Sequence, residues 1–210
     1  MTFSAAQPEA DRSGSAGQFD PRILSLISEL ENLKIVYRRS YVIDQSRKEN
    51  SAEHSWQLAL TLLIFHRTFA PEIDIDRAIR MALVHDIAEI GAGDVPVYST
   101  AERAAIGAAE GAYLAGLVAE HQGFAHDVYA LWQEFEEQKT LESRWVKVGD
   151  RILPILLNLA TEGRTWRDLD VAHSQVTAVT QTIAELAPPL YEWMQGQLEM
   201  AVSQGWLKPG

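Results

Sequence analysis

Apolar residues recur every three or four positions along most of the chain, which is the spacing of amphipathic helices. Asn50 followed three residues later by Glu53 has the pattern of a capping box at a helix start. Ser99 with Glu102 repeats that pattern, and Pro21 suits the first position of another helix. The pattern predicts helices over residues 21–34, 51–69, 76–89, 100–121, 127–137, 140–161, 169–186 and 189–204.

Glycines, a proline and one aperiodic segment interrupt these helices. The third helix should stop at Gly91 and Gly93, and Pro154 should kink or break the helix over 140–161, because it lacks a backbone donor. The segment VYRRSYVIDQSRKEN, residues 36–50, lacks a helical period, which indicates an ordered loop. No convincing strand alternation or hairpin turn is visible, so the sequence predicts an all-α fold.

The ends of the chain and its longest apolar runs bear on organisation and location. Residues 1–18, MTFSAAQPEADRSGSAGQ, have little apolar bulk and are predicted to be a disordered tail, which leaves residues 19–210 as one domain. The densest apolar run, LALTLLIF, has eight residues, far short of the roughly 20 that cross a bilayer. With no signal-peptide pattern at the start, we expect a cytoplasmic protein without a membrane partner.

Composition narrows the chemistry further. The chain contains no cysteine, so any bound metal needs nitrogen and oxygen ligands. A formal net charge of −11 argues against a nucleic-acid polymer as partner, because such binders track phosphates with a basic surface. A small anionic substrate remains compatible, since a metal and a few arginines can reverse the field locally.

The predicted helix over 76–89 carries polar side chains within an otherwise apolar segment, IRMALVHDIAEI. Residues three and four apart share a helix face, so Glu89 lies on the side of His85 and Asp86. Buried carboxylates are costly unless they are paired or bound to a cation. A divalent metal would remove that cost.

Two other helices offer ligands of the same kind. His54 precedes apolar residues at helical spacing, and Asp150 lies within WVKVGDRILPILL. His54, His85, Asp86 and Asp150 would supply two imidazoles and two carboxylates and leave coordination positions for water. Such a set suits a divalent ion, whether manganese, cobalt, zinc, magnesium, nickel or iron.

Four motifs together carry a family resemblance. LKIVYR, RKENSAEHS, HDIAEIGAGD and LWQEFEEQKTLESRWVKVGDRI follow one another in this order over about residues 26–160. The chain thereby resembles the HD-domain metal-dependent phosphohydrolases, and within them the small 5′-deoxynucleotidase branch. The resemblance implies a compact HD-domain helical bundle with the metal site between helices, and a homodimer.

The resemblance also implies roles for individual residues. His54, His85, Asp86 and Asp150 become the metal ligands. Glu89 becomes the group that orients or deprotonates the attacking water, Asp94 a second acid at the substrate, and Arg38 a phosphate contact.

The resemblance does not assign a role to two further arginines. Arg39 stands where some relatives place an aromatic residue, which leaves the base and sugar preference open. Arg47 is a further candidate for holding the substrate phosphate, with a solvated loop as the alternative.

The leading hypothesis is therefore a phosphomonoesterase that removes the 5′-phosphate from nucleotides, deoxynucleoside 5′-monophosphates above all, by attack of a metal-activated water. One alternative is an HD-type di-iron oxygenase, which would need further histidines near the metal, with His121 and His126 as the candidates. The other alternative is a non-catalytic HD module that binds a nucleotide. The presence of both Glu89 and Asp94 argues against it, because a binding module has no need of both acids.

Overall fold

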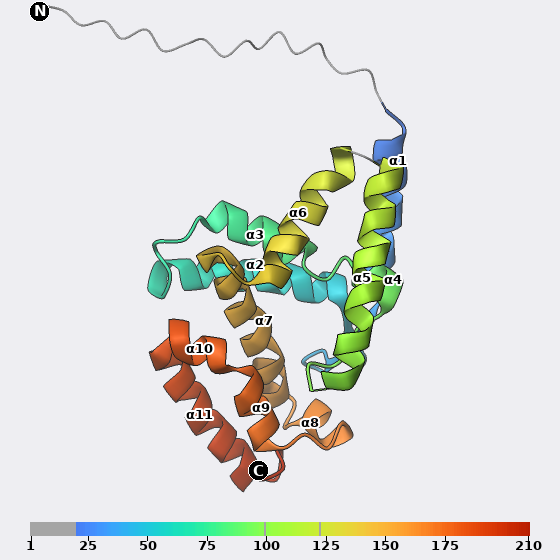
Figure 1. Ribbon diagram of the computed structural model, residues 1–210. Helices are drawn as coiled ribbons and strands as arrows, with labels where there is room; N and C mark the ends of the chain where they lie inside the picture. The colour runs from blue at the N-terminus through green and yellow to red at the C-terminus, as the bar shows by residue number, and fades with distance from the viewer. Residues whose placement is uncertain (1–19, 99, 122) are drawn as a thin grey trace, which may run out of the picture.

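A computed structural model describes residues 20–98, 100–121 and 123–210 (Figure 1). These residues are mainly helical, which confirms the all-α prediction apart from one small sheet. The predicted disordered tail over 1–18 and the Ser99–Glu102 capping box lie outside the described residues. The helices are α1 Arg22–Leu30, α2 Ser51–Thr68, α3 Ile75–Val84, α4 Glu89–Ala92, α5 Thr100–His121, α6 Gly123–Glu137, α7 Leu141–Ala160, α8 Arg164–Asp168, α9 His173–Val179, α10 Gln181–Leu186 and α11 Pro188–Ser203.

Helix α7 runs through the middle of the molecule, with α2 and α3 near one end and α8, α9 and α11 near the other (Figure 1). Its buried apolar side chains join those of α2, α3, α10 and α11 in the larger core. A smaller core joins α1, α4, α5 and α6. Among the described residues, no helix is long and apolar enough to cross a membrane.

Local signals place the starts of the two helices that matter most for the site. At α2, the Asn50 side chain accepts a hydrogen bond from the Glu53 backbone, and the Glu53 side chain accepts one from the Asn50 backbone, which confirms the capping box. At α7, the Thr140 hydroxyl accepts a hydrogen bond from the backbone nitrogen of Ser143. Pro154 was predicted to kink or break this helix; α7 continues past it to Ala160, so the helix is not broken there.

The segment predicted as a loop contains a two-stranded antiparallel sheet, β1 (Tyr37–Tyr41) and β2 (Lys48–Asn50). Tyr37 pairs with Asn50 and Tyr41 with Lys48, with an irregularity between the two pairs. The prediction failed because these strands are short and rich in charged residues. Their pairing depends on backbone hydrogen bonds rather than on an apolar face.

Helix boundaries also differ from the prediction around the HD dipeptide. Helix α3 ends at Val84, five residues before the predicted end at Glu89, and α4 begins at Glu89. Between them the backbone makes tight hydrogen bonds from Ile87 to Val84 and from Glu89 to Asp86. The segment therefore stays wound, but with a tighter turn than an α-helix.

The C-terminal part contains more breaks than its apolar pattern indicates. Helix α8 was not predicted, and the single helix predicted over 169–186 is two helices, α9 and α10, that meet at Thr180. The buried Thr180 hydroxyl donates to the carbonyl of Val176. Such back-bonding by a side chain competes with the regular helix ladder.

Candidate metal centre and cleft

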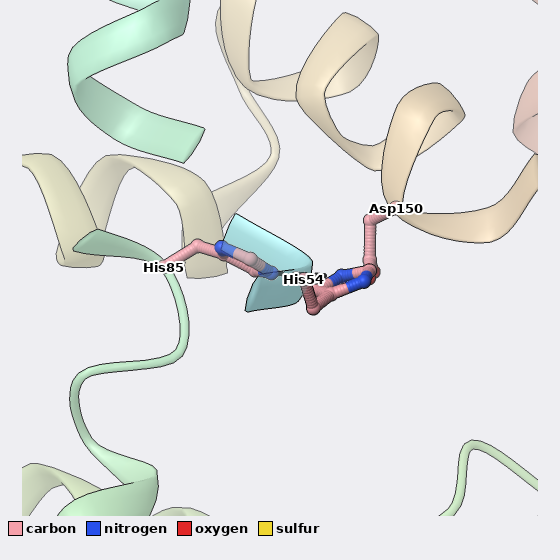
Figure 2. Close-up of side chains that lie close together, drawn as sticks. All are labelled: His54, His85 and Asp150. Atoms are coloured by element: carbon pink, nitrogen blue, oxygen red, sulfur yellow. Dashed lines mark hydrogen bonds and ion pairs between the residues drawn. The ribbon is translucent and has the colours of Figure 1, made fainter. Parts of the chain in front are cut away.

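Three helical segments bring three of the four predicted metal ligands together. His54 comes from α2, His85 from the residue that follows α3, and Asp150 from α7 (Figure 2). Their candidate ligand atoms all lie within 4.8 Å of one another, and all three residues are buried. His54 Nε2 lies 3.2 Å and His85 Nε2 lies 3.8 Å from the same oxygen of Asp150.

A glycine lies where α7 packs against α2. A β-carbon at Gly149 would lie 2.5 Å from the end of the fully buried Leu58 side chain on α2, so a larger residue would force that side chain to move. Gly149 directly precedes Asp150 in α7. The glycine therefore leaves room for the Leu58 side chain at the point where α7 carries Asp150.

The hydrogen bonding of His85 fits a metal ligand. Its Nδ1 lies 2.8 Å from the carbonyl oxygen of Ala82, and since a carbonyl can only accept, Nδ1 carries the proton. Its Nε2 is buried and, within the described part of the chain, has no hydrogen-bond partner, although Asp86 Oδ1 lies 3.0 Å away. A buried nitrogen whose other ring position is held by a backbone carbonyl is typical of a metal-binding histidine.

The charges around the two imidazoles also favour a bound cation. Burial lowers the pKa of His54 to about 4, so this ring is neutral at neutral pH and can offer a lone pair. Burial also opposes a charge on His85, yet the neighbouring carboxylates of Asp86 and Asp150 raise its pKa to about 10. The carboxylates of Asp86 and Asp150 thus give the site a negative potential, which a bound divalent ion would neutralise.

The fourth predicted ligand, Asp86, lies beside this cluster and also contacts an arginine. One Asp86 oxygen faces His85, and the other accepts a hydrogen bond of 2.8 Å from Arg38 Nη1. Arg38 is also 3.8 Å from Asp94. Arg38, the predicted phosphate contact, thus links Asp86 to Asp94, the predicted second acid, next to the metal cluster.

Glu89 occupies a buried position near the cluster without belonging to it. Its carboxylate accepts a hydrogen bond of 2.7 Å from the Ser51 hydroxyl at the start of α2. Burial and the nearby charge of Asp86 raise the pKa of Glu89 well above its usual value. A carboxyl group with a raised pKa next to a metal site is suited to accept a proton near neutral pH.

Asp94 reaches the site because of the turn that follows α4. Gly93 has a φ of 80°, which a glycine adopts without strain, and the turn brings the next residue back toward Arg38. The Asp94 side chain is largely buried.

A cleft opens onto the cluster. His85, Asp86 and Asp150 line it on the metal side, together with Glu89 and Asp94. The other walls contain apolar and aromatic side chains, namely Val95, Pro96, Val97, Tyr98, Trp132, Phe135, Pro154 and Leu169.

The cleft also contains two cationic side chains that the sequence interpretation missed. Lys147 and Arg151, which flank Asp150 on α7, line the wall together with Arg39 of β1, which the sequence had already singled out. Arg151 Nη1 donates a hydrogen bond of 3.1 Å to Asp150, and Lys147 Nζ lies 3.7 Å from the same oxygen. Their spacing of four residues around Asp150 was the signal available in the sequence, because it places both on one helix face.

Arg47 is placed elsewhere. It is exposed, is not among the residues that line the cleft, and donates two hydrogen bonds of 2.8 and 2.6 Å to Glu53. The structure therefore gives no support to Arg47 as a phosphate contact, because its guanidinium is already paired at the surface.

The histidines considered for a second metal also lie apart from the cluster. His121 Nδ1 lies 3.2 Å from the carbonyl oxygen of Arg22 and 3.4 Å from the hydroxyl of Ser25, so it fastens the end of α5 to α1. His126 is exposed on α6. Within the described part of the chain, the cluster contains only His54 and His85 as histidines, which disfavours a di-iron centre.

Known proteins resemble the chain over most of its length. The sequence model of the HD domain family matches residues 30–190. The 5′-deoxynucleotidase HDDC2 of Xenopus laevis is 31% identical over 159 residues, which cover 71% of this chain and 74% of that protein. The crystal structure of a predicted metal-dependent phosphohydrolase from Magnetospirillum magnetotacticum is 34% identical with a TM-score of 0.80, and the match covers 90% of this chain and 95% of that one.

A more distant structure shares the fold alone. An HD-domain phosphohydrolase from Listeria innocua is 17% identical with a TM-score of 0.58, and the match covers 87% of this chain and 86% of that one.

The family match includes His54, His85, Asp86 and Asp150 within its bounds. The chain therefore belongs to the HD domain family and is a hydrolase of its metal-dependent phosphohydrolase group.

Proposed function

We propose that the protein is a phosphomonoesterase that removes the 5′-phosphate from nucleotides, deoxynucleoside 5′-monophosphates above all. The observation that carries this proposal is the convergence of the His54, His85 and Asp150 cluster with Glu89 and Arg38 at one cleft. The 5′-deoxynucleotidase relatives support the choice of substrate.

We further propose His54, His85, Asp86 and Asp150 as the ligands of a divalent ion. Such an ion would lower the pKa of a bound water to roughly 7–9 and would neutralise phosphoryl oxygens. Glu89 would orient this water and accept its proton, while Ser51 holds the carboxylate in place through its 2.7 Å hydrogen bond. Arg38 would hold the phosphate, and Asp94 would stand at the sugar or leaving-group side.

The walls of the cleft suit the rest of a nucleotide. Arg39, Lys147 and Arg151 offer positive charge, and Trp132 and Tyr98 offer apolar rings. Arguments for either alternative are weaker. Among the described residues the cluster has no further histidine of the kind a di-iron site needs, and Glu89 and Asp94, which line the cleft beside it, are two acids that a binding module does not need.

Phosphate release from a panel of nucleotides tests the function directly. The protein loaded with Mn²⁺ or Co²⁺ should release inorganic phosphate from deoxynucleoside 5′-monophosphates, and a chelator should abolish this release until metal is added back. Nucleoside 3′-monophosphates serve as controls with the same charge and a different phosphate position. Phosphate release from 3′- and 5′-monophosphates alike would contradict the proposed specificity, and two bound irons with an optical band would favour the oxygenase.

We also propose a homodimer, as the resemblance implies, in the cytoplasm. The last helix offers little apolar surface for its interface, because α11 buries Met194 and Leu198 in the core and its exposed large apolar residue is Trp193. A broader exposed apolar surface lies on α2, at Trp56, Leu60, Leu63 and Ile64.

Light scattering of the purified protein should give twice the 23.4 kDa chain mass at micromolar concentration. Leu60→Glu should then give the monomer, because it buries a charge in the proposed interface. Trp193→Glu is the matched substitution on α11 and should leave the dimer intact. A monomeric wild type would refute the dimer, and dissociation by Trp193→Glu alone would move the interface to the last helices.

A further inference from the structure

Glu49 is a buried carboxylate that the proposed mechanism leaves without a role. It is 4% exposed and lies in β2, directly before the Asn50 cap of α2. Its Oε2 is buried and, among the described residues, makes no hydrogen bond. A buried carboxylate oxygen without a hydrogen bond is uncommon and calls for an explanation.

The two groups that face this oxygen both belong to the site. His54 Nδ1 lies 3.8 Å from Glu49 Oε2, on the side of the imidazole opposite to Asp150. Arg38 Nε lies 3.5 Å from the same Glu49 oxygen and is itself buried without a hydrogen bond. One carboxylate thus lies between the proposed metal ligand on α2 and the proposed phosphate contact on β1.

The chemistry of a metal-binding imidazole explains why an acceptor is needed there. A neutral histidine that offers Nε2 to a cation carries its proton on Nδ1, and a carboxylate or carbonyl that accepts this proton fixes the tautomer and the ring orientation. The carbonyl of Ala82 does this for His85, at 2.8 Å. For His54, the carboxylate in the corresponding position is that of Glu49, with its Oε2 3.8 Å from Nδ1.

The small sheet makes this arrangement possible. Arg38 is in β1 and Glu49 in β2, and pairing of the two strands brings their side chains within 3.5 Å of each other, directly before α2 begins. The capping box then fixes the start of the helix that carries His54.

We propose that Glu49 is a positioning residue that orients His54 for metal binding and aligns Arg38 with it. The proposal rests on the function proposed above, since it assumes that His54 binds a metal and Arg38 a phosphate. Its alternative is that Glu49 only balances the charge of buried Arg38 in the fold. The two differ in one quantity, the affinity of the protein for metal in the absence of substrate.

Titration of the metal-free protein with Co²⁺, followed by calorimetry and by the visible absorption of the ion, measures this affinity. Glu49→Gln should weaken Co²⁺ binding by roughly 10–100-fold, the usual cost of losing a partner behind a metal-binding histidine. Glu49→Asp keeps the charge but retracts the carboxylate from His54, so its affinity should fall between those of Glu49→Gln and the wild type. Inorganic phosphate should also bind the Co²⁺-loaded Glu49→Gln variant more weakly, because Arg38 loses its alignment.

Glu53→Gln is the matched control, because it makes the same carboxylate-to-amide change four residues away at a half-buried position. Glutamine can still complete the capping box, so Co²⁺ affinity should stay at the wild-type value. Circular dichroism of each metal-free variant checks the fold.

Co²⁺ affinity of folded Glu49→Gln within about threefold of the wild type would overturn the inference, whatever happens to turnover. If Glu49→Gln does not fold, Glu49→Asp decides, and wild-type affinity in that variant would overturn it. A wild type that binds Co²⁺ but hydrolyses no nucleotide would refute the proposed substrate and leave the Glu49 comparison valid. A wild type without Co²⁺ binding would remove the metal centre on which both proposals rest.

Discussion

Replacing Glu89 by glutamine is expected to lower turnover on a deoxynucleoside 5′-monophosphate by roughly 10²–10⁴-fold, the usual cost of losing a general base. Glutamine keeps the size of the side chain and can still accept the hydrogen bond from Ser51, but it cannot accept a proton. Glu89 lies outside the His54, His85 and Asp150 cluster, so metal content should stay near the wild-type value. Steady-state kinetics with metal analysis of the same preparation measure both quantities.

The stability of this variant provides a second check. Burial and the charge of Asp86 raise the pKa of Glu89, so an ionised Glu89 destabilises the metal-free fold. Glu89→Gln should therefore melt at or above the wild-type temperature. Full turnover in the folded variant would refute the proposed mechanism. Loss of metal would make Glu89 a ligand or a support for the ligands, and Asp94 would then be the remaining acid for water activation.

Asp150→Ala is expected to have the larger effect on the metal itself. Asp150 shares one oxygen between His54 and His85, and its other oxygen contacts Arg151 and Lys147. Its removal takes away the carboxylate at the centre of the cluster, so metal affinity should fall by more than the roughly 10–100-fold that an outer partner costs. Activity should disappear together with the metal.

The same variant should also be less stable without metal. Removing one partner of a buried ion pair costs about 3–5 kcal/mol in comparable sites, and here Arg151 loses the carboxylate that lies 3.1 Å from it. Denaturant unfolding of the metal-free protein measures this loss. Asp127→Ala on the exposed face of α6 is the control and should change neither stability nor metal content. Wild-type metal affinity in Asp150→Ala would remove Asp150 from the proposed ligand set.

The sequence by itself determined the features that depend on local geometry. Helical periodicity predicted most of the helices, and the capping box of Asn50 and Glu53 is present as expected. Motif spacing identified the family and pointed to His54, His85 and Asp150, which the structure brings within one cluster. These features were predictable because the helix period decides which residues share a face, and a cap involves residues only three apart.

Only the tertiary structure decided which distant groups became partners. Pairing of β1 with β2 places Arg38 beside Glu49, although their short charged strands lack an alternating pattern. The hydrogen bond of Ser51 with Glu89 joins residues 38 positions apart. Arg47 pairs with Glu53 at the surface and does not line the cleft. No local pattern specifies such choices, because they follow from how whole helices and strands pack and from which polar groups that packing leaves to be paired.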